Sequence, residues 1–118
     1  MKYQITSDNI DLSPSMEELT KGKFERIENR IKSFPEEQTH TRVVLNSAPD
    51  GMFTVKAKLN VNGKEYFSDE TDFSLEGALI KTVEEIVQMI ERDKSIMERK
   101  RNKQMGEVEE FEEVEGEQ

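Results

Sequence analysis

Polar and hydrophobic residues follow two different periods along this chain, and the shorter period predicts four strands. Residues 2–8 place Tyr3 and Ile5 on one face of a short strand, because successive side chains of a strand point to opposite sides. Residues 52–61 alternate more strictly between apolar and polar side chains. Residues 39–47 are rich in β-branched side chains, which favour strands, and residues 64–73 follow as the last strand.

Two longer segments carry apolar residues at steps of three to five positions, which is typical of a helix that buries one face. The first covers residues 14–34, with Ser13 as its N-cap and a proline at the first helical position, where a missing N–H costs nothing. Pro35 follows its last residue and stops it. The second helix is predicted over residues 75–103, with Ser74 as its N-cap.

Two predicted turns join the last three strands into consecutive hairpins. Asn62-Gly63 is the most favourable two-residue hairpin turn, because both residues tolerate positive φ, and Ala48-Pro49-Asp50-Gly51 is a turn sequence. The order of elements is β-α-β-β-β-α, in which the strand–helix–strand unit makes a parallel pair with a right-handed crossover. We therefore predict an α+β domain with a four-stranded mixed sheet, two helices packed on one face and the other face left to solvent or a partner.

Charge is distributed unevenly along the chain. The 118 residues include 17 Lys and Arg and 26 Asp and Glu, giving a net charge of -9, which argues against nucleic-acid binding because polyanions repel acidic proteins. All the basic residues lie at or before Lys103, however, and seven glutamates fall in the last thirteen positions. We predict a nearly neutral domain, residues 1–105, followed by an acidic tail, residues 106–118, that stays disordered until something binds it.

Residue types that carry catalysis or metal binding are scarce. The chain has no cysteine, and its one histidine, His40, lies in a polar segment and is interpreted as an exposed structural residue. Zinc sites need several nitrogen or sulfur ligands, and the glycines do not form a phosphate-binding loop. We expect no enzyme activity, no metal and no cofactor. Because no segment approaches the ~18 apolar residues of a membrane span, we expect a cytoplasmic protein without membrane contact, monomeric when free.

Basic residues of the two predicted helices are the main functional signal. Lys23, Arg26 and Arg30 are three and four positions apart and therefore share one exposed ridge of the first helix. The second helix carries a similar ridge, and two such ridges side by side would form a groove that neutralises several phosphates. The candidate RNA-binding residues are Lys23, Arg26, Arg30, Lys81, Gln88, Arg92, Lys94, Arg99, Lys100, Arg101 and Lys103.

A second interpretation of these cations is structural. Glutamates interleave with them on both helices, so many of the cations would form ion pairs on solvated helix faces. Lys56 and Lys58, on the outer face of the predicted sheet, are interpreted as solubilising and edge-protecting residues. The sequence leaves both interpretations of the helix cations open.

Several stretches occur in an order and at spacings that resemble one known family. They are the opening "QITSDNIDLSPSMEE", the helical "KFERIENRI", the strand "RVVL", the strand before "NVNG" and the terminal "EEFEEVEGE". Together, over roughly residues 2–104, they resemble the ribosome hibernation factors of the protein Y, or ribosome-associated inhibitor A, type. The resemblance implies a stress or stationary-phase protein that binds small-subunit rRNA at the decoding region through both helices. It would block the mRNA path and the A- and P-site tRNA positions, and the acidic tail points to the type that favours idle single ribosomes.

The resemblance can be followed residue by residue on the helices. It places the family's first-helix cations on Lys23 and Arg26, with Arg30 beside them. In the second helix Glu85 stands where the family has a cation, whereas Arg92 keeps one. The cations beyond residue 93 would compensate for the missing charge.

Two functional hypotheses follow from the sequence. In the first, the protein silences translation by occupying the decoding region of the small ribosomal subunit, without chemistry and without binding DNA. In the second, it is a diverged regulatory module that binds a protein partner instead of rRNA, which its net charge and its missing second-helix cations favour. A double-stranded RNA-binding domain has a related order of elements, but its basic helix start is missing here.

Overall fold

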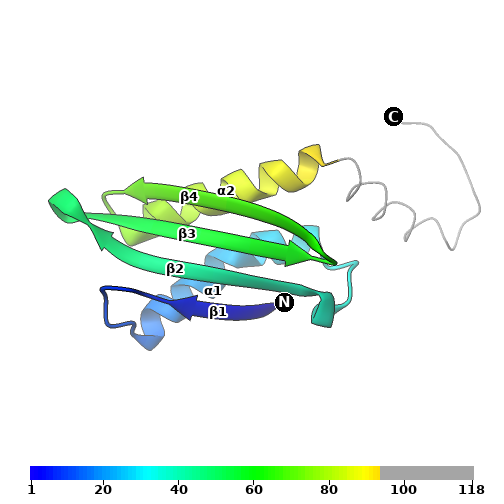
Figure 1. Ribbon diagram of the computed structural model, residues 1–118, viewed down its shortest axis with the longest axis horizontal. Helices are drawn as coiled ribbons and strands as arrows, with labels where there is room; N and C mark the ends of the chain where they lie inside the picture. The colour runs from blue at the N-terminus through cyan, green and yellow to red at the C-terminus, as the bar shows by residue number, and fades with distance from the viewer. Residues whose placement is uncertain (94–118) are drawn as a thin grey trace, which may run out of the picture.

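The computed structural model describes residues 1–93, and the order of elements in it is β-α-β-β-β-α (Figure 1). The predicted α+β class is confirmed. Two short 3₁₀ turns, Glu36–Gln38 and Pro49–Gly51, precede β2 and β3. The strands are β1 (Lys2–Thr6), β2 (Thr39–Ala48), β3 (Met52–Val61) and β4 (Lys64–Asp72), and the helices are α1 (Pro14–Arg30) and α2 (Leu75–Arg92).

The four strands form one mixed sheet in the order β1-β2-β3-β4. β1 pairs with β2 in parallel, with Ile5 opposite Val43, and the remaining neighbours are antiparallel hairpins. Both helices lie on the same side of the sheet, behind the strands in Figure 1, as the sequence predicted. The opposite side of the sheet is not covered by any element within residues 1–93.

The core lies between the sheet and the two helices. Alternate residues of β3 are buried, because one face of this central strand packs on the helices. Phe24 and Ile27 of α1 are fully buried, and each contributes about 1.5–3 kcal/mol by leaving water. α2 buries the longest stripe of the two helices, with Ala78, Leu79, Thr82, Val83, Ile86, Val87 and Ile90.

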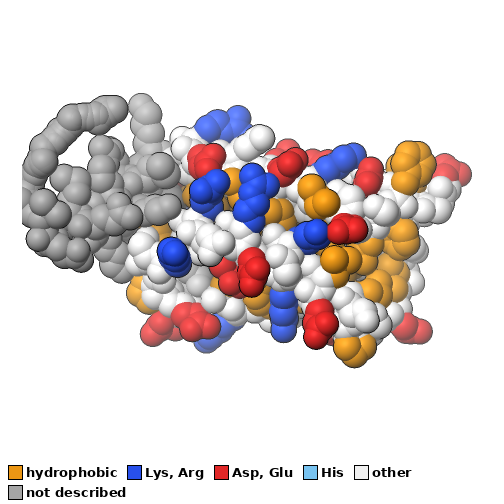
Figure 2. Space-filling model, turned by 180° about the vertical axis from the view of Figure 1, so that it is seen from behind, with side chains coloured by type: hydrophobic (Ala, Val, Ile, Leu, Met, Phe, Trp, Pro, Cys, Tyr) orange, Lys and Arg blue, Asp and Glu red, His pale blue; other side chains and the backbone are white. Residues whose placement is uncertain are grey.

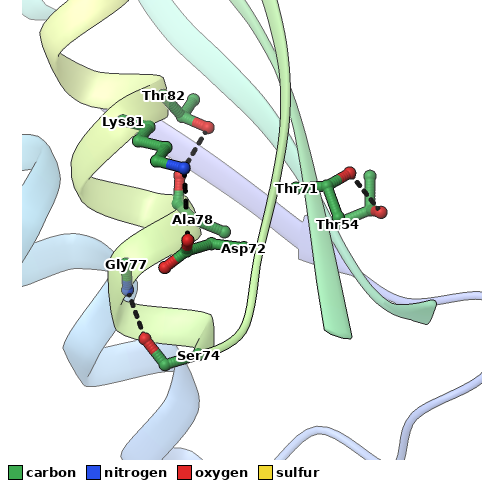
Figure 3. A network of polar contacts seen from close by, with 8 residues as sticks. All are labelled: Thr54, Thr71, Asp72, Ser74, Gly77, Ala78, Lys81 and Thr82. Carbon is green, nitrogen blue, oxygen red and sulfur yellow. Dashed lines mark hydrogen bonds and ion pairs between the residues drawn. The ribbon is translucent and has the colours of Figure 1, made fainter. Parts of the chain in front are cut away.

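Serine caps begin both helices, as predicted. The Ser13 hydroxyl accepts a hydrogen bond from the Met16 backbone N–H at 3.2 Å, and the Ser74 hydroxyl accepts one from the Gly77 N–H at 2.9 Å (Figure 3). Each cap contributes about 1 kcal/mol by satisfying a backbone donor that the helix leaves unpaired. A Cβ on Gly77 would lie 1.8 Å from a carboxylate oxygen of Asp72, so a larger residue there would displace the Asp72 side chain.

Both predicted hairpin turns are confirmed. Asn62 and Gly63 have φ values of 52° and 89°, which is the geometry that links two strands with the right-handed twist of a sheet. The longer turn between β2 and β3 uses two residues of positive φ, Asp50 at 63° and Gly51 at 73°. These turns fix the register in which the β2–β3 and β3–β4 ladders pair.

The first helix is shorter than predicted. α1 ends at Arg30, and Ile31 leaves helical geometry with φ of -120° and ψ of 17°. Pro35 disfavours helical backbone at the residue before it, so the last predicted turn becomes a bend. Phe34 is nevertheless buried in the core, which explains why it fitted the apolar stripe. The first strand also ends two residues early, at Thr6.

The second helix also departs from the prediction of one helix over residues 75–103. α2 ends at Arg92, and Asp93 has extended backbone with φ of -83° and ψ of 104°. The Asp93 carboxylate accepts a hydrogen bond from the Tyr66 hydroxyl at 2.7 Å and lies 3.4 Å from the Lys64 ammonium, which ties it to the start of β4. The prediction of an unbroken helix is wrong at this residue. The predicted domain boundary and acidic tail lie outside the described residues.

Candidate nucleic-acid interface

The basic ridge predicted on α1 lies beside α2, with Arg26 exposed and Lys23 and Arg30 half-buried. Lys23, Arg26 and Arg30 keep the predicted spacing. The Lys23 ammonium lies 2.9 Å from the Glu76 carboxylate, and the Arg30 guanidinium lies 3.0 Å from Glu91. Both acids belong to α2, so these two ion pairs join the helices. Arg26 is exposed and forms no ion pair with any residue in the described part of the chain.

The cations of α2 are arranged differently. The Lys81 ammonium donates to the Asp72 carboxylate at 3.1 Å, and this hydrogen bond holds the pKa of Asp72 below its usual range (Figure 3). Arg92 is exposed, and its Nε donates to the Gln88 carbonyl at 3.3 Å. Gln88 and Arg92 line a shallow hollow of about 240 Å³ together with Glu91. Lys81 is therefore engaged by β4, whereas Arg92 is open to a ligand.

The helix side as a whole carries mixed charge. α1 has four Lys and Arg and four Glu, and α2 has two Lys and Arg and four Glu, so the two helices together have a net charge of about -2. Figure 2 shows this side, with blue and red side chains interleaved. The structural interpretation made from the sequence thus applies to Lys23, Arg30 and Lys81. The remaining predicted cations, Lys94, Arg99, Lys100, Arg101 and Lys103, lie outside the described residues.

The β4 edge adds negative potential beside α2. A side-chain hydrogen bond with Glu85 raises the pKa of Glu70, and burial and the charge of Glu85 raise it further. Glu85 also accepts a hydrogen bond from the Ser68 hydroxyl at 2.6 Å. Two carboxyl groups that share hydrogen bonds in this way disfavour a polyanion at this edge.

A second group of cations lies on the open face of the sheet, and the prediction of binding residues did not include it. Lys2, Arg42, Lys56 and Lys58 are all exposed and alternate with residues that face the core. β1, β2 and β3 contain no Asp or Glu. The interpretation of Lys56 and Lys58 as edge-protecting residues is wrong, because β3 pairs on both sides and is an interior strand. The missing acidic residues were a signal that the sequence already contained.

Other site types have little support in the part of the chain that the structure describes. No three His, Cys, Asp or Glu side chains within residues 1–93 come together as metal ligands. His40 is exposed, as expected, on the open face of the sheet. No helix in this range is long and apolar enough to cross a membrane.

Comparison with known proteins decides the family. The family model described as Sigma 54 modulation protein / S30EA ribosomal protein matches residues 3–98. The chain belongs to this S30AE family. The match covers every helix and strand of the domain except the first residue of β1. The resemblance proposed from the sequence is thus confirmed.

Solved structures similar to this S30AE protein share its fold. The Thermus thermophilus Protein Y N-terminal domain has a TM-score of 0.68 at 18% identity, covering 78% of this chain and 98% of that one. A ribosomal subunit interface protein from Coxiella burnetii has a TM-score of 0.53 at 18% identity, covering 86% of this chain and 99% of that one. Comparison with curated protein sequences gives no match.

Proposed function

We propose that this S30AE protein associates with the small ribosomal subunit and keeps idle ribosomes from translating. In this proposal the helix side binds rRNA at the decoding region, and the bulk of the domain blocks the mRNA path and the A- and P-site tRNA positions. No bond is made or broken. The observation that carries the proposal is the family match over residues 3–98, together with the likeness to two solved structures, a Protein Y domain and a ribosomal subunit interface protein.

The described cations indicate where rRNA would bind. Arg26 forms no ion pair within residues 1–93, and Arg30 presents 41% of its side chain to solvent, beside Arg26 on the same ridge. Arginine suits this role because its planar fork matches phosphate geometry. We assign the central rRNA contact to Arg26 and Arg30, flanked by Lys23 and Arg92.

Co-sedimentation with purified small subunits over a range of salt concentrations tests the proposal. We expect binding that weakens with salt, because each phosphate contact releases counterions. The R26Q/R30Q variant should bind several-fold more weakly and lower the salt slope by about 1.4–1.8, at 0.7–0.9 per cation. The same variant should inhibit in vitro translation less than the unmodified protein.

A matched variant controls for net charge. K32Q/K64Q removes two exposed cations that lie outside the α1 ridge, one after the end of α1 and one at the start of β4. It should leave subunit binding nearly unchanged. Absence of co-sedimentation at low salt would refute the proposal, and equal losses for the two variants would refute the assignment of the contact to α1.

One observation favours a second candidate, a regulatory module that binds a protein partner. α2 carries twice as many acidic as basic residues within its described range, and Glu84 is exposed. An acidic helix is suited to a basic protein surface. Pull-down from a nuclease-treated lysate distinguishes the candidates: a stoichiometric partner that persists after RNA is destroyed, without ribosomal subunits, favours the module.

A further inference from the structure

The open face of the sheet carries a cationic surface that the proposed function does not use. We define the sheet patch as the outward side chains of β1, β2 and β3 with the neighbouring aromatic of β4. We propose that the sheet patch binds single-stranded RNA, independently of the helix side. Its members are Lys2, His40, Arg42, Lys56, Lys58 and Phe67.

The pairing of the strands brings these side chains together. Arg42 and Lys58 are directly paired across β2 and β3, and Lys58 is paired with Phe67 across β3 and β4. Neighbouring strands are about 4.8 Å apart, and residues two apart on one strand are separated by about 6.6 Å. Lys56 and Lys58 are two residues apart on the same face, at a spacing similar to that of successive phosphates in an extended strand. The patch can therefore contact several phosphates of one strand.

Charge distinguishes the sheet patch from the helix side. Its three strands contribute four Lys and Arg without any Asp or Glu, whereas the two helices have a net charge of about -2. Two acids of β4 share the open face: Glu65 lies 3.8 Å from the Lys58 ammonium, at the upper limit of an ion pair, and Asp69 is paired with Lys56 across β3 and β4. They leave the outward side chains of the sheet with more Lys and Arg than Asp and Glu. Within the described residues, the most concentrated positive charge thus lies on the sheet and not on the helices.

Shape and aromatic content favour RNA over an acidic polypeptide. Phe67 exposes 56% of its surface beside Lys58, and an apolar ring of this size in water is a platform on which a base can stack. A hollow of about 340 Å³ on β1, β2 and β3 is lined by Lys2, His40, Arg42 and Lys58, with Glu65 of β4 also in its wall. A strand of RNA supplies both the anion and the flat ring that these two features accept. An acidic peptide supplies only the anion.

The test uses the full-length protein and an oligouridylate of about ten nucleotides, within the site size of a single-strand-binding domain. Binding is followed by fluorescence anisotropy over a range of salt concentrations, and the contact is mapped by backbone amide NMR shifts. We expect R42Q/K58Q to lower the salt slope by about 1.4, at 0.7 per cation on a single strand. F67A should weaken binding about tenfold without changing the slope. The largest shifts should fall on β1, β2 and β3.

A charge-matched variant separates this proposal from the one above. R26Q/R30Q removes the same charge from the helix side, so it should weaken subunit binding several-fold and leave oligouridylate binding nearly unchanged. R42Q/K58Q should lose oligouridylate binding. E65Q removes the ion-pair partner of Lys58 and should strengthen oligouridylate binding. A damaged fold would weaken binding, so it could not produce this gain.

Three outcomes would overturn the proposal. The first is an oligouridylate affinity that R42Q/K58Q and R26Q/R30Q lower equally, which would indicate attraction by net charge alone. The second is a set of NMR shifts confined to α1 and α2. The third is no detectable binding at low salt. A failure of small-subunit co-sedimentation would leave the proposal intact, because the oligonucleotide assay contains no ribosome.

Discussion

The ion pairs between the helices lead to a prediction opposite to the usual effect of mutation: removing two interactions should improve binding. Lys23 and Arg30 are paired with Glu76 and Glu91 of α2, at 2.9 and 3.0 Å. A phosphate that binds either cation must compete with its carboxylate. The E76Q/E91Q variant keeps the size and polarity of the side chains and removes the competition.

The size of the effect follows from the exposure of these pairs. All four side chains are between 32% and 56% exposed, and pairs exposed to this degree are worth about 0.2–1 kcal/mol each. Releasing two pairs should thus lower the free energy of binding by roughly 0.4–2 kcal/mol, which is about two- to thirtyfold in Kd. The free energy of unfolding should fall by no more than the same amount.

Equilibrium co-sedimentation with small subunits measures the effect, with E18Q/E84Q as the control. Glu18 and Glu84 are exposed, lie one on each helix and form no ion pair among residues 1–93, so this control changes the net charge equally. We expect a larger gain for E76Q/E91Q than for the control. Equal gains would mean that only long-range charge matters, and no gain would refute the assignment of rRNA to the helix side.

Three further variants test the fold. Glu70→Gln should stabilise the protein at neutral pH and have little effect near pH 4. The pKa of Glu70 is raised in the folded state, so its ionisation destabilises the fold as pH rises past the unfolded-state pKa. Glutamine removes the repulsion from Glu85, so the melting temperatures of the variant and the unmodified protein, measured at several pH values, should converge in acid. Tyr3→Phe removes a hydroxyl that donates to Glu28 and joins β1 to α1, so chemical denaturation should show a loss of about 1 kcal/mol, and an unchanged midpoint would contradict this. Gly63→Ala places a side chain at φ of 89° and should cost about 1–2 kcal/mol in the same assay, whereas a neutral result would mean that the turn adopts another geometry.

Local signals predicted most of the fold. Both serine caps, the Asn62-Gly63 turn and the alternation in β3 depend on interactions within a few residues, so the sequence displays them directly. The errors arose where contacts between residues far apart in the sequence determine where an element ends. α2 ends at Arg92, and the Asp93 carboxylate that follows it accepts a hydrogen bond from Tyr66, 27 residues earlier, a contact that no periodicity within the helix records.

The candidate site was predicted less completely than the fold. Helix spacing placed Lys23, Arg26 and Arg30 on one ridge, but which glutamates pair with them depends on how α1 and α2 pack. The cations of the sheet patch are spread over three strands, and only the order of strands brings them together. Lys56 and Lys58 were misjudged because the position of β3 inside the sheet depends on pairing and not on its own sequence.

The parallel strand β1 has a consequence for the order in which the molecule opens. It has five residues and pairs only with β2, and its partners lie 38 positions away in the register that joins Lys2 to His40. β1 has few hydrogen bonds to lose, and its pairing closes a long loop at a cost in chain entropy, so its detachment should require the least free energy of the four strands. Its amides should therefore be among the first of the sheet to exchange with solvent. Detachment leaves β2 as an unpaired edge, the kind of edge on which protein chains aggregate. Arg42 projects from that edge, and its charge hinders a second molecule from pairing there before β1 returns.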